Sequence, residues 1–395
     1  MATKTCSAVP LLALRGLAAA VLAVVAVAGP ATAVESSGGQ RLAGTGVIVD
    51  AAAPAPPQIA ADSWLVADLD TGQVLAAKDP HGRFAPASTL KMLTALTLLP
   101  LIAPDRRLVP TFDDVNVDGS KVGVVERVAY PASELFSALL MVSGNDAANV
   151  LATAAGGQQV VAAAMNERAR ELGALDTHAV NPHGLDAVGQ FSSAYDLALL
   201  GRAAFADPDF LRYARTRNAS VSGPGGKRID IANKNRMLRT YPGMIAGKNG
   251  YTIASRGSYV GAAERDGHRV VVTLMKSTPK VFEEATKLLD WGFAAQAKGV
   301  EPVGELLPAA AERAQLPVVP AQRTFGPATG LLSAADDTTG LPVTLAGMGL
   351  AAAAILSVRH RPRPPTSRRA TGSAPVQRQA PAQPARTPVG IRRAG

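Results

Sequence analysis

A serine and a lysine stand three residues apart at the start of a stretch that is predicted to be helical. Ser88 and Lys91 occur in the segment Ala87–Leu93, whose letters are ASTLKML. Residues i and i+3 share a helix face, so we expect the hydroxyl and the amine to be neighbours. A neutral lysine there can take the serine proton and make the serine a nucleophile. The spacing alone is weak evidence, because Ser277 and Lys280 repeat it further along the chain.

Two further short patterns follow, and each has side chains suited to holding a substrate. Residues 143–145 are Ser-Gly-Asn, the only Ser-x-Asn in the chain, and their glycine interrupts two helical stretches. That interruption is typical of a loop that presents side chains. Residues 248–250 are Lys-Asn-Gly and precede a predicted hairpin. The second Ser-x-x-Lys, at residues 277–280, follows both patterns, and we reject it on order.

The elements expected around these patterns are strands near both ends of a folded unit and helices between them. Ser63–Leu69 and Gln73–Ala77 predict a hairpin, and Gly257–Ala263 with His268–Met275 predicts another. Helical stretches are expected at Ala87–Leu99, Ala132–Val142, Ala147–Ala155, Val160–Leu172, Tyr195–Phe205 and Lys280–Gln296. The pattern predicts an α/β (α+β) fold: one antiparallel sheet built from both ends, with a helical insertion lobe.

In this order, the three patterns resemble the Ser-x-x-Lys, Ser-x-Asn and Lys-Thr-Gly signature of penicillin-binding proteins and serine β-lactamases. The surrounding letters are similar to those of the low-molecular-mass D-alanyl-D-alanine carboxypeptidases: SGNDAA at 143–148, NPHGLD at 181–186 and YPGMIAGKNGYT at 241–252. The resemblance covers about residues 61–296 and implies a β-lactamase/transpeptidase-like fold.

The same resemblance implies a reaction. It is the hydrolysis of the terminal D-Ala from the peptidoglycan stem pentapeptide, with neither a metal nor a cofactor. β-Lactam antibiotics would be inhibitors, and the protein would serve peptidoglycan biosynthesis, the cell wall and cell shape.

Each residue of the patterns has an implied role in this reaction. Ser88 would attack the penultimate D-Ala carbonyl and form an acyl-enzyme, with Lys91 as general base. An ordinary lysine has a pKa of about 10.4, and burial and the second cation, Lys248, should favour its neutral form. Ser143 would relay a proton to the leaving amine, and Asn145 would hold the substrate backbone.

The third pattern is expected to bind the substrate. Lys248 would supply a positive field for the terminal carboxylate, and Gly250 completes the pattern. The backbone N–H groups of Ser88 and Tyr251 would form the oxyanion hole. Asn249 stands where the family usually has threonine. Its amide can donate to a carboxylate, so carboxylate binding is expected to survive, whereas a hydroxyl relay is not.

Other functions remain open. A DD-endopeptidase would use the same fold, and a serine β-lactamase would need a glutamate that Glu167 and Glu171 do not match in context. A zinc carboxypeptidase would depend on His178 and His183, which lack metalloprotease spacing. We interpret His183 instead as a buried hydrogen-bonding residue. A membrane-anchored, non-enzymatic homologue would bind peptidoglycan without releasing D-Ala.

The charge is concentrated at one end of the chain. The 395 residues carry a formal charge of +9, and residues 359–395 contain nine Arg and no Asp or Glu. The body, residues 34–340, has a net charge of −2, and aromatic residues are 4% of the chain, which argues against a nucleic-acid partner. The only cysteine is Cys6 in the predicted leader, so disulfides and thiol catalysis are excluded from the mature protein.

Six segments are predicted from composition. They are a signal peptide (1–33), an Ala/Pro-rich linker (34–60), the catalytic domain (61–300), a Pro-containing linker (301–337), a transmembrane helix (338–358) and a disordered basic cytoplasmic tail (359–395). The arginines after residue 358 indicate that the tail lies on the cytoplasmic side of the membrane. We therefore expect a single-pass protein of a bacterial cell membrane, with its catalytic domain on the extracytoplasmic side and no second β-rich domain.

Overall fold

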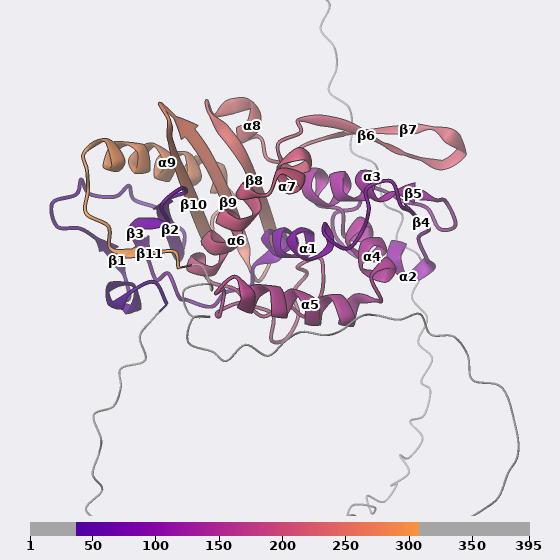
Figure 1. The fold of residues 1–395 in the computed structure, drawn as a ribbon, viewed down its shortest axis with the longest axis horizontal. Helices are drawn as coiled ribbons and strands as arrows, with labels where there is room; N and C mark the ends of the chain where they lie inside the picture. Colours follow the sequence, from indigo (N-terminus) through magenta and orange to yellow (C-terminus); the bar gives the residue numbers. More distant parts are fainter. Residues whose placement is uncertain (1–36, 308–395) are drawn as a thin grey trace, which may run out of the picture. The chain divides into compact units, whose positions relative to one another are not determined.

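A computed structural model of the protein describes residues 37–307 (Figure 1). The predicted signal peptide (1–33), transmembrane helix (338–358) and cytoplasmic tail (359–395) lie outside these residues. Within the described part of the chain, no helix has both the length and the apolar character needed to cross a membrane.

An antiparallel sheet joins the beginning and the end of the folded unit, as the sequence predicts. Its strands run in the order β1-β3-β2-β10-β9-β8, and β11 also pairs with β3. They are β1 Val47–Val49, β2 Ser63–Asp68, β3 Gln73–Lys78, β8 Met244–Thr252, β9 Arg256–Arg265, β10 His268–Ser277 and β11 Gly304–Glu305. β2 and β10 pair at the centre, with Trp64 opposite Leu274. The sheet thus depends on a contact between residues far apart in the sequence.

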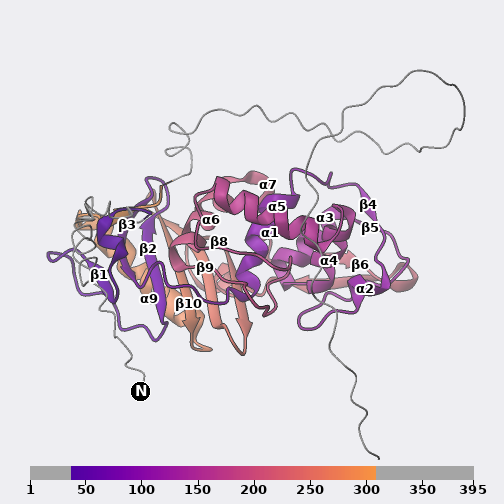
Figure 2. The same cartoon turned by 90° about the horizontal axis from the view of Figure 1, so that it is seen from below.

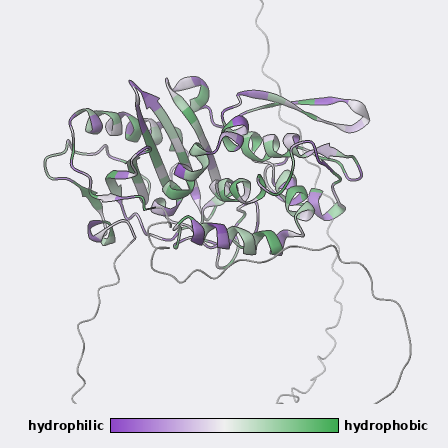
Figure 3. Cartoon of the chain, viewed as in Figure 1, coloured by the Kyte–Doolittle hydropathy of each residue, from purple (hydrophilic) through white to green (hydrophobic). Residues whose placement is uncertain are grey.

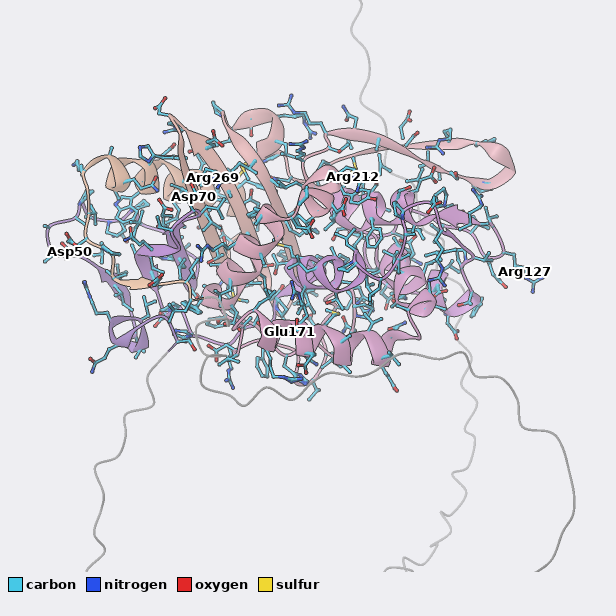
Figure 4. The ribbon with its side chains drawn as sticks, in the orientation of Figure 1. Asp50, Asp70, Arg127, Glu171, Arg212 and Arg269 are labelled. Atoms are coloured by element: carbon cyan, nitrogen blue, oxygen red, sulfur yellow. The ribbon has the colours of Figure 1, made fainter. Side chains whose placement is uncertain are left out.

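Both predicted hairpins are present. β2 and β3 form the first, and an ion pair between Asp70 in its turn and Arg269 of β10 lies beside it (Figure 4). β9 and β10 form the second across Asp266 and Gly267, whose φ angles are 52° and 79°. Two positive φ values in a two-residue turn match the right-handed twist of the paired strands, which explains the sharp reversal.

Helices cover both faces of the sheet (Figures 1 and 2). Alternate residues of β2 point to opposite sides: Leu65 and Ala67 enter one hydrophobic core with the helical lobe, and Trp64 and Val66 enter another beneath α9. Hydrophobic residues run along the central strands and the adjoining helices (Figure 3).

Each predicted helical stretch is present close to its expected limits, as α1 Lys91–Leu98, α3 Ala132–Ser137, α4 Asn145–Ala154, α5 Gln158–Glu171, α6 Ala194–Ala206 and α9 Val281–Ala297. Three short helices were not predicted: α2 Phe112–Val115, α7 Pro208–Ala214 and α8 Met237–Thr240. The stretch expected as one helix over Ala87–Leu99 begins as a 3₁₀ turn at Ala87–Leu90, and the stretch expected over Ala132–Val142 ends as a π-helical turn at Ala138–Val142.

Both ends of the described chain differ from the predicted linkers. Within the predicted linker 34–60, Leu42 is fully buried and strand β1 pairs with β3. After residue 300, Val303 and Leu306 are buried and β11 pairs with β3. The domain edges predicted at residues 61 and 300 therefore exclude segments that are folded onto the sheet. These segments are too short and too rich in Gly, Ala and Pro to show a periodic pattern.

A further hairpin was not expected from the sequence. β6 Asn218–Ser222 and β7 Arg228–Ala232 pair with each other and project from the helical lobe (Figure 1). Two small strands, β4 Arg107–Leu108 and β5 Tyr130–Pro131, pair within the lobe. The β6–β7 hairpin leads into the loop before α8, which brings another charged residue to the site.

Candidate active site

Ser88 and Lys91 lie where the 3₁₀ turn passes into α1. Lys91 Nζ donates a hydrogen bond to Ser88 Oγ at 3.0 Å, so the contact that the i, i+3 spacing predicts is present. The side chain of Lys91 is completely buried. It also donates to Asn145 Oδ1 at 2.7 Å and to the carbonyl oxygen of His183. The amine is therefore held between oxygen atoms of three different elements.

The turn before Ser88 is held in a rarely populated conformation. Ala87 has a φ of 50°, which is uncommon for a residue with a side chain. Gly184 packs directly against it, since a Cβ on Gly184 would lie 2.0 Å from the carbonyl oxygen of Ala87. On the sheet side, Ser258 Oγ donates to the carbonyl of Pro86 at 2.7 Å. The position of Ser88 thus depends on contacts from the loop at 181–186 and from β9.

Ser143 and Asn145 flank a sharp change of chain direction. The π-helical turn Ala138–Val142 ends at Ser143, whose φ of 64° is left-handed, and α4 begins at Asn145. π-Helical turns are uncommon and often occur at functional sites. This one directs Ser143 towards Lys248, whose Nζ donates to Ser143 Oγ at 3.1 Å.

Strand β8 supplies the remaining side of the site. It is the last strand of the sheet order, and Lys248 on it is only 2% exposed. Lys248 Nζ also donates to the backbone carbonyl of Asn249 at 2.8 Å. A Cβ on Gly250 would lie 2.6 Å from the backbone nitrogen of Ser88, so this position needs glycine for the strand to approach the serine. The side chain of Tyr251 is 61% exposed.

The amide of Asn145 makes contacts that the sequence did not suggest. Its Oδ1 accepts from Lys91, and its Nδ2 donates to the carbonyl of Asp118 at 2.6 Å. In this structure Asn145 positions the lysine and the loop near residue 118. Its expected contact with a substrate backbone would use the second amide hydrogen.

Electrostatics favour neutral amines in this site. Burial, followed by the charges of Lys248 and Lys234, holds the pKa of Lys91 well below its usual value, and Asp146 acts in the opposite direction. Burial and the charge of Lys234 lower the pKa of Lys248 to about 7. A deprotonated Lys91 has only two N–H groups to donate, so its free electron pair can face Ser88 and accept the serine proton.

His183 is the buried hydrogen-bonding residue that the sequence suggested. It is 7% exposed, and its Nδ1 accepts a hydrogen bond from the backbone N–H of Leu185 at 3.3 Å. Burial and the nearby Lys91 lower its pKa to about 3, so the ring is neutral at physiological pH. His178 lies elsewhere, with Nδ1 2.8 Å from the carbonyl of Gly189. Within residues 37–307, no three His, Cys, Asp or Glu side chains converge as metal ligands would.

The second Ser-x-x-Lys pair is engaged elsewhere. Ser277 is buried at the end of β10 and donates its hydroxyl to Glu284 Oε2 at 2.6 Å. Lys280 occupies the position just before α9, where its side chain makes no capping hydrogen bond. Rejecting this pair on chain order therefore agrees with its place in the fold.

Sequence reasoning missed two residues that contribute to the site. Lys234, in the loop between β7 and α8, donates to Ser120 Oγ at 2.9 Å. Neither Lys234 nor Ser120 belongs to one of the three sequence patterns or lies at a fixed spacing from them. The loop at 181–186 was noticed only for its letters, and its closing contact joins Thr252 Oγ1 to Asp186 Oδ1 at 2.7 Å. Long-range contacts of this kind leave no periodic signal in a sequence.

Comparison with known proteins gives consistent matches. Residues 50–278 match a family described as D-alanyl-D-alanine carboxypeptidase. D-alanyl-D-alanine carboxypeptidase DacB2 of Mycobacterium tuberculosis is 43% identical over 245 residues, covering 60% of this chain and 84% of that protein. D-alanyl-D-alanine carboxypeptidase DacD of Salmonella typhimurium is 34% identical over 259 residues, covering 61% of this chain and 64%, less than two thirds, of that protein.

Solved structures show the same architecture. A D-alanyl-D-alanine carboxypeptidase from Mycobacterium tuberculosis H37Rv superposes with a TM-score of 0.61 at 42% identity, covering 62% of this chain and 96% of that one. A variant of the Streptomyces K15 DD-transpeptidase gives 0.58 at 26% identity, covering 60% of this chain and 99% of that one. The β-lactamase/transpeptidase-like fold expected from the sequence is thereby confirmed.

Proposed function

This chain belongs to the D-alanyl-D-alanine carboxypeptidase family, and from that premise we propose that it acts through an acyl-enzyme on Ser88. The substrate is a peptidoglycan stem pentapeptide that ends in D-Ala-D-Ala, and the product is the peptide shortened by one D-Ala. The observation that carries the assignment to Ser88 is its 3.0 Å contact with the buried amine of Lys91.

The proposed reaction has two stages. Lys91 takes the proton of Ser88 Oγ, which attacks the carbonyl carbon of the penultimate D-Ala, and the N–H groups of Ser88 and Tyr251 stabilise the oxyanion. The C–N bond then breaks, and Ser143 relays the proton held by Lys91 to the leaving D-Ala amine, so that Lys91 is neutral again and Ser143 keeps its hydroxyl proton. Water subsequently attacks the ester and releases the shortened peptide and Ser88.

The state of the two lysines gives this reaction its pH dependence. Acylation needs a neutral Lys91, so its rate rises as pH increases through the lowered pKa of that amine. Lys248 attracts the terminal carboxylate when protonated, and it loses that proton above about pH 7. The pair supports a bell-shaped profile, and the two limbs belong to the coupled cluster.

The test is D-Ala release from a pentapeptide ending in D-Ala-D-Ala, followed by mass analysis. Wild type is expected to shorten the peptide by one residue and to be labelled covalently by a fluorescent penicillin. Ser88→Ala should do neither, whereas Ser277→Ala, which alters the other Ser-x-x-Lys pair, should retain labelling. Release of D-Ala by Ser88→Ala would rule out the acyl-enzyme.

We also propose that the catalytic unit works outside the cytoplasmic membrane and is held there by residues 338–358. Support comes from the sequence: the leader at 1–33, the uncharged 21-residue segment and the arginines that follow it. In a bacterial host, the full chain should sediment with membranes, and its body should be digested by protease added outside spheroplasts. Deleting 338–395 should release it, and a soluble full-length protein would contradict the anchor.

A further inference from the structure

A third lysine belongs to the charged surroundings of the site. Lys234 Nζ donates to Ser120 Oγ at 2.9 Å, and its charge is one of the causes that lower the pKa of both Lys91 and Lys248. The pKa of Lys234 itself is lowered by partial burial. This residue is therefore close enough to act on both site lysines, although it lies in a different loop.

The backbone of this loop is firmly anchored. Asn233 and Asn235, on either side of Lys234, are each 1% exposed, and the N–H of Asn235 donates to Asn233 Oδ1 at 2.9 Å. The N–H of Lys234 donates to the carbonyl of Met141 at 2.8 Å, two residues before Ser143. The loop thus supports the π-helical turn that presents Ser143, and its own side chain has a defined starting point.

Ser120, the partner of Lys234, belongs to a loop that contacts Asn145 directly. The N–H of Asn145 donates to the carbonyl of Ser120 at 2.7 Å, and its Nδ2 donates to the carbonyl of Asp118. The N–H groups of Val122 and Gly123 donate to the Asp146 carboxylate at 3.0 and 2.8 Å. The loop at 118–124 therefore holds the residue whose Oδ1 accepts from Lys91.

We propose that Lys234 is a positioning residue for acylation: with Ser120 it holds the loop at 118–124 on Asn145, and it places a positive charge beside Lys91 and Lys248. The inference rests on the proposed function, because it assigns Lys234 a part in the reaction of Ser88. It connects the unexpected β6–β7 hairpin with the site, since this hairpin ends at the loop that carries Lys234.

All charged groups around Lys91 bear on the expected pH effect. Lys248 faces it from β8 and Lys234 from the loop before α8, while Asp146 of α4 opposes them. His183 from the neighbouring loop is neutral at physiological pH. Without the charge of Lys234, one of the causes that lower the pKa of Lys91 is gone, while Asp146 still raises it. Lys91 should then bind its proton more tightly and become neutral only at a higher pH.

The experiment measures the rate of acylation by a fluorescent penicillin across pH in the full chain. In Lys234→Met, the acidic limb of the pH–rate profile is expected to shift to higher pH by about half a unit or more. The acylation rate at pH 7 should fall several-fold. Lys234→Arg keeps the charge and should keep the limb near its wild-type position. Ser120→Ala should lower the rate without moving the limb, because the charge remains.

Lys227→Met is the matched control, since it removes one exposed lysine from the turn between β6 and β7. It should change neither rate nor limb, and thermal melts verify folding of each variant. The proposal would be overturned if the acidic limb of Lys234→Met lay at the same pH as that of wild type, or if Lys227→Met shifted it equally. If Lys234→Met fails to fold, Lys234→Gln takes its place. If wild type is acylated normally and only the limb is unmoved, the proposed function stands and this inference alone fails.

Discussion

At the scale of single residues, the site is built around buried amines. Lys91 and Lys248 are 0% and 2% exposed, and the acceptors of their hydrogen bonds are hydroxyl, amide and carbonyl oxygens. Burying a charged amine away from water is unfavourable, so each group has a lowered pKa. A site with this composition lowers the stability of the fold in exchange for a lysine that can act as a base.

Replacing Lys248 by methionine should therefore raise stability while abolishing function. The pKa of Lys248 is about 7 in the folded chain, against an unfolded value of about 10.4. Between these values the unfolded chain binds more protons, so the wild-type free energy of unfolding increases with pH there. Lys248→Met lacks that slope. It should be more stable than wild type by about 1–4 kcal/mol near pH 6–7, with the gap closing towards pH 10.

Urea denaturation at pH 6, 8 and 9.5 measures this difference, and labelling by penicillin should be lost at every pH. Lys227→Met, at an exposed position, serves as the control and should follow the wild-type pH dependence. Lower stability of Lys248→Met at pH 6 would show that its hydrogen bonds to Ser143 and Asn249 outweigh the burial of the amine.

At the scale of elements, the site residues lie where one type of structure changes into another. Ser88 precedes α1 in a 3₁₀ turn, Ser143 follows a π-helical turn, and Lys248 lies on the edge strand β8. Positive φ values at Ala87 and Ser143 show that both turns depend on neighbouring structure to hold them. The loop at 181–186 provides that support for the first turn through the close contact of Gly184 with Ala87.

A pair of glycine substitutions, one in that loop and one just after it, separates the effect of the contact from that of backbone strain. Gly184 and Gly189 have φ values of 83° and 82°, but a Cβ would meet the Ala87 carbonyl at 2.0 Å in the first case and no atom within 4 Å in the second. Gly189→Ala should lose about 1 kcal/mol of stability and acylate normally. Gly184→Ala should lose more and acylate about 100-fold more slowly or worse, because it displaces the turn that carries Ser88.

Acylation rates and melting temperatures of the two variants provide the comparison. Equal behaviour in both assays would mean that the contact with Ala87 does not position the serine.

At the scale of the whole described unit, segments near the two ends of residues 37–307 meet on β3. β1 and β11 both pair with this strand, and Leu42, Val303 and Leu306 are buried beside them. Tyr195 of α6 donates its hydroxyl to the carbonyl of Glu305 at 2.9 Å. The folded unit therefore extends beyond the limits at residues 61 and 300 that composition suggested.

Fragments with different ends test this extent. A fragment of residues 37–307 should melt cooperatively and react with labelled penicillin. A fragment limited to residues 61–300 lacks the buried side chains of Leu42, Val303 and Leu306 and exposes the core residues that they cover. Its free energy of unfolding should be lower by roughly 4–9 kcal/mol as an upper limit. That is comparable with the whole stability of a typical domain, so we expect it not to fold. Equal melting temperatures for the two would show that the segments at both ends are dispensable linkers after all.

Contacts between residues close together in the chain could be predicted from the sequence of this protein. The spacing of Ser88 and Lys91 predicts their contact because three residues span nearly one helical turn. Apolar runs on either side of short turn sequences predict the hairpins because those signals lie close together in the chain. The order of the three patterns, with the letters around them, was enough to indicate the family.

Only the tertiary structure decided what depends on contacts between distant segments. Gly184 contacts Ala87, Lys234 contacts Ser120, and β1 and β11 both pair with β3. These contacts join residues far apart in the chain, so no local spacing encodes them. The lowered pKa of Lys91 was expected in direction, but its causes are burial and charges from other elements. A sequence states which groups can be charged, whereas the packing around them determines whether they are.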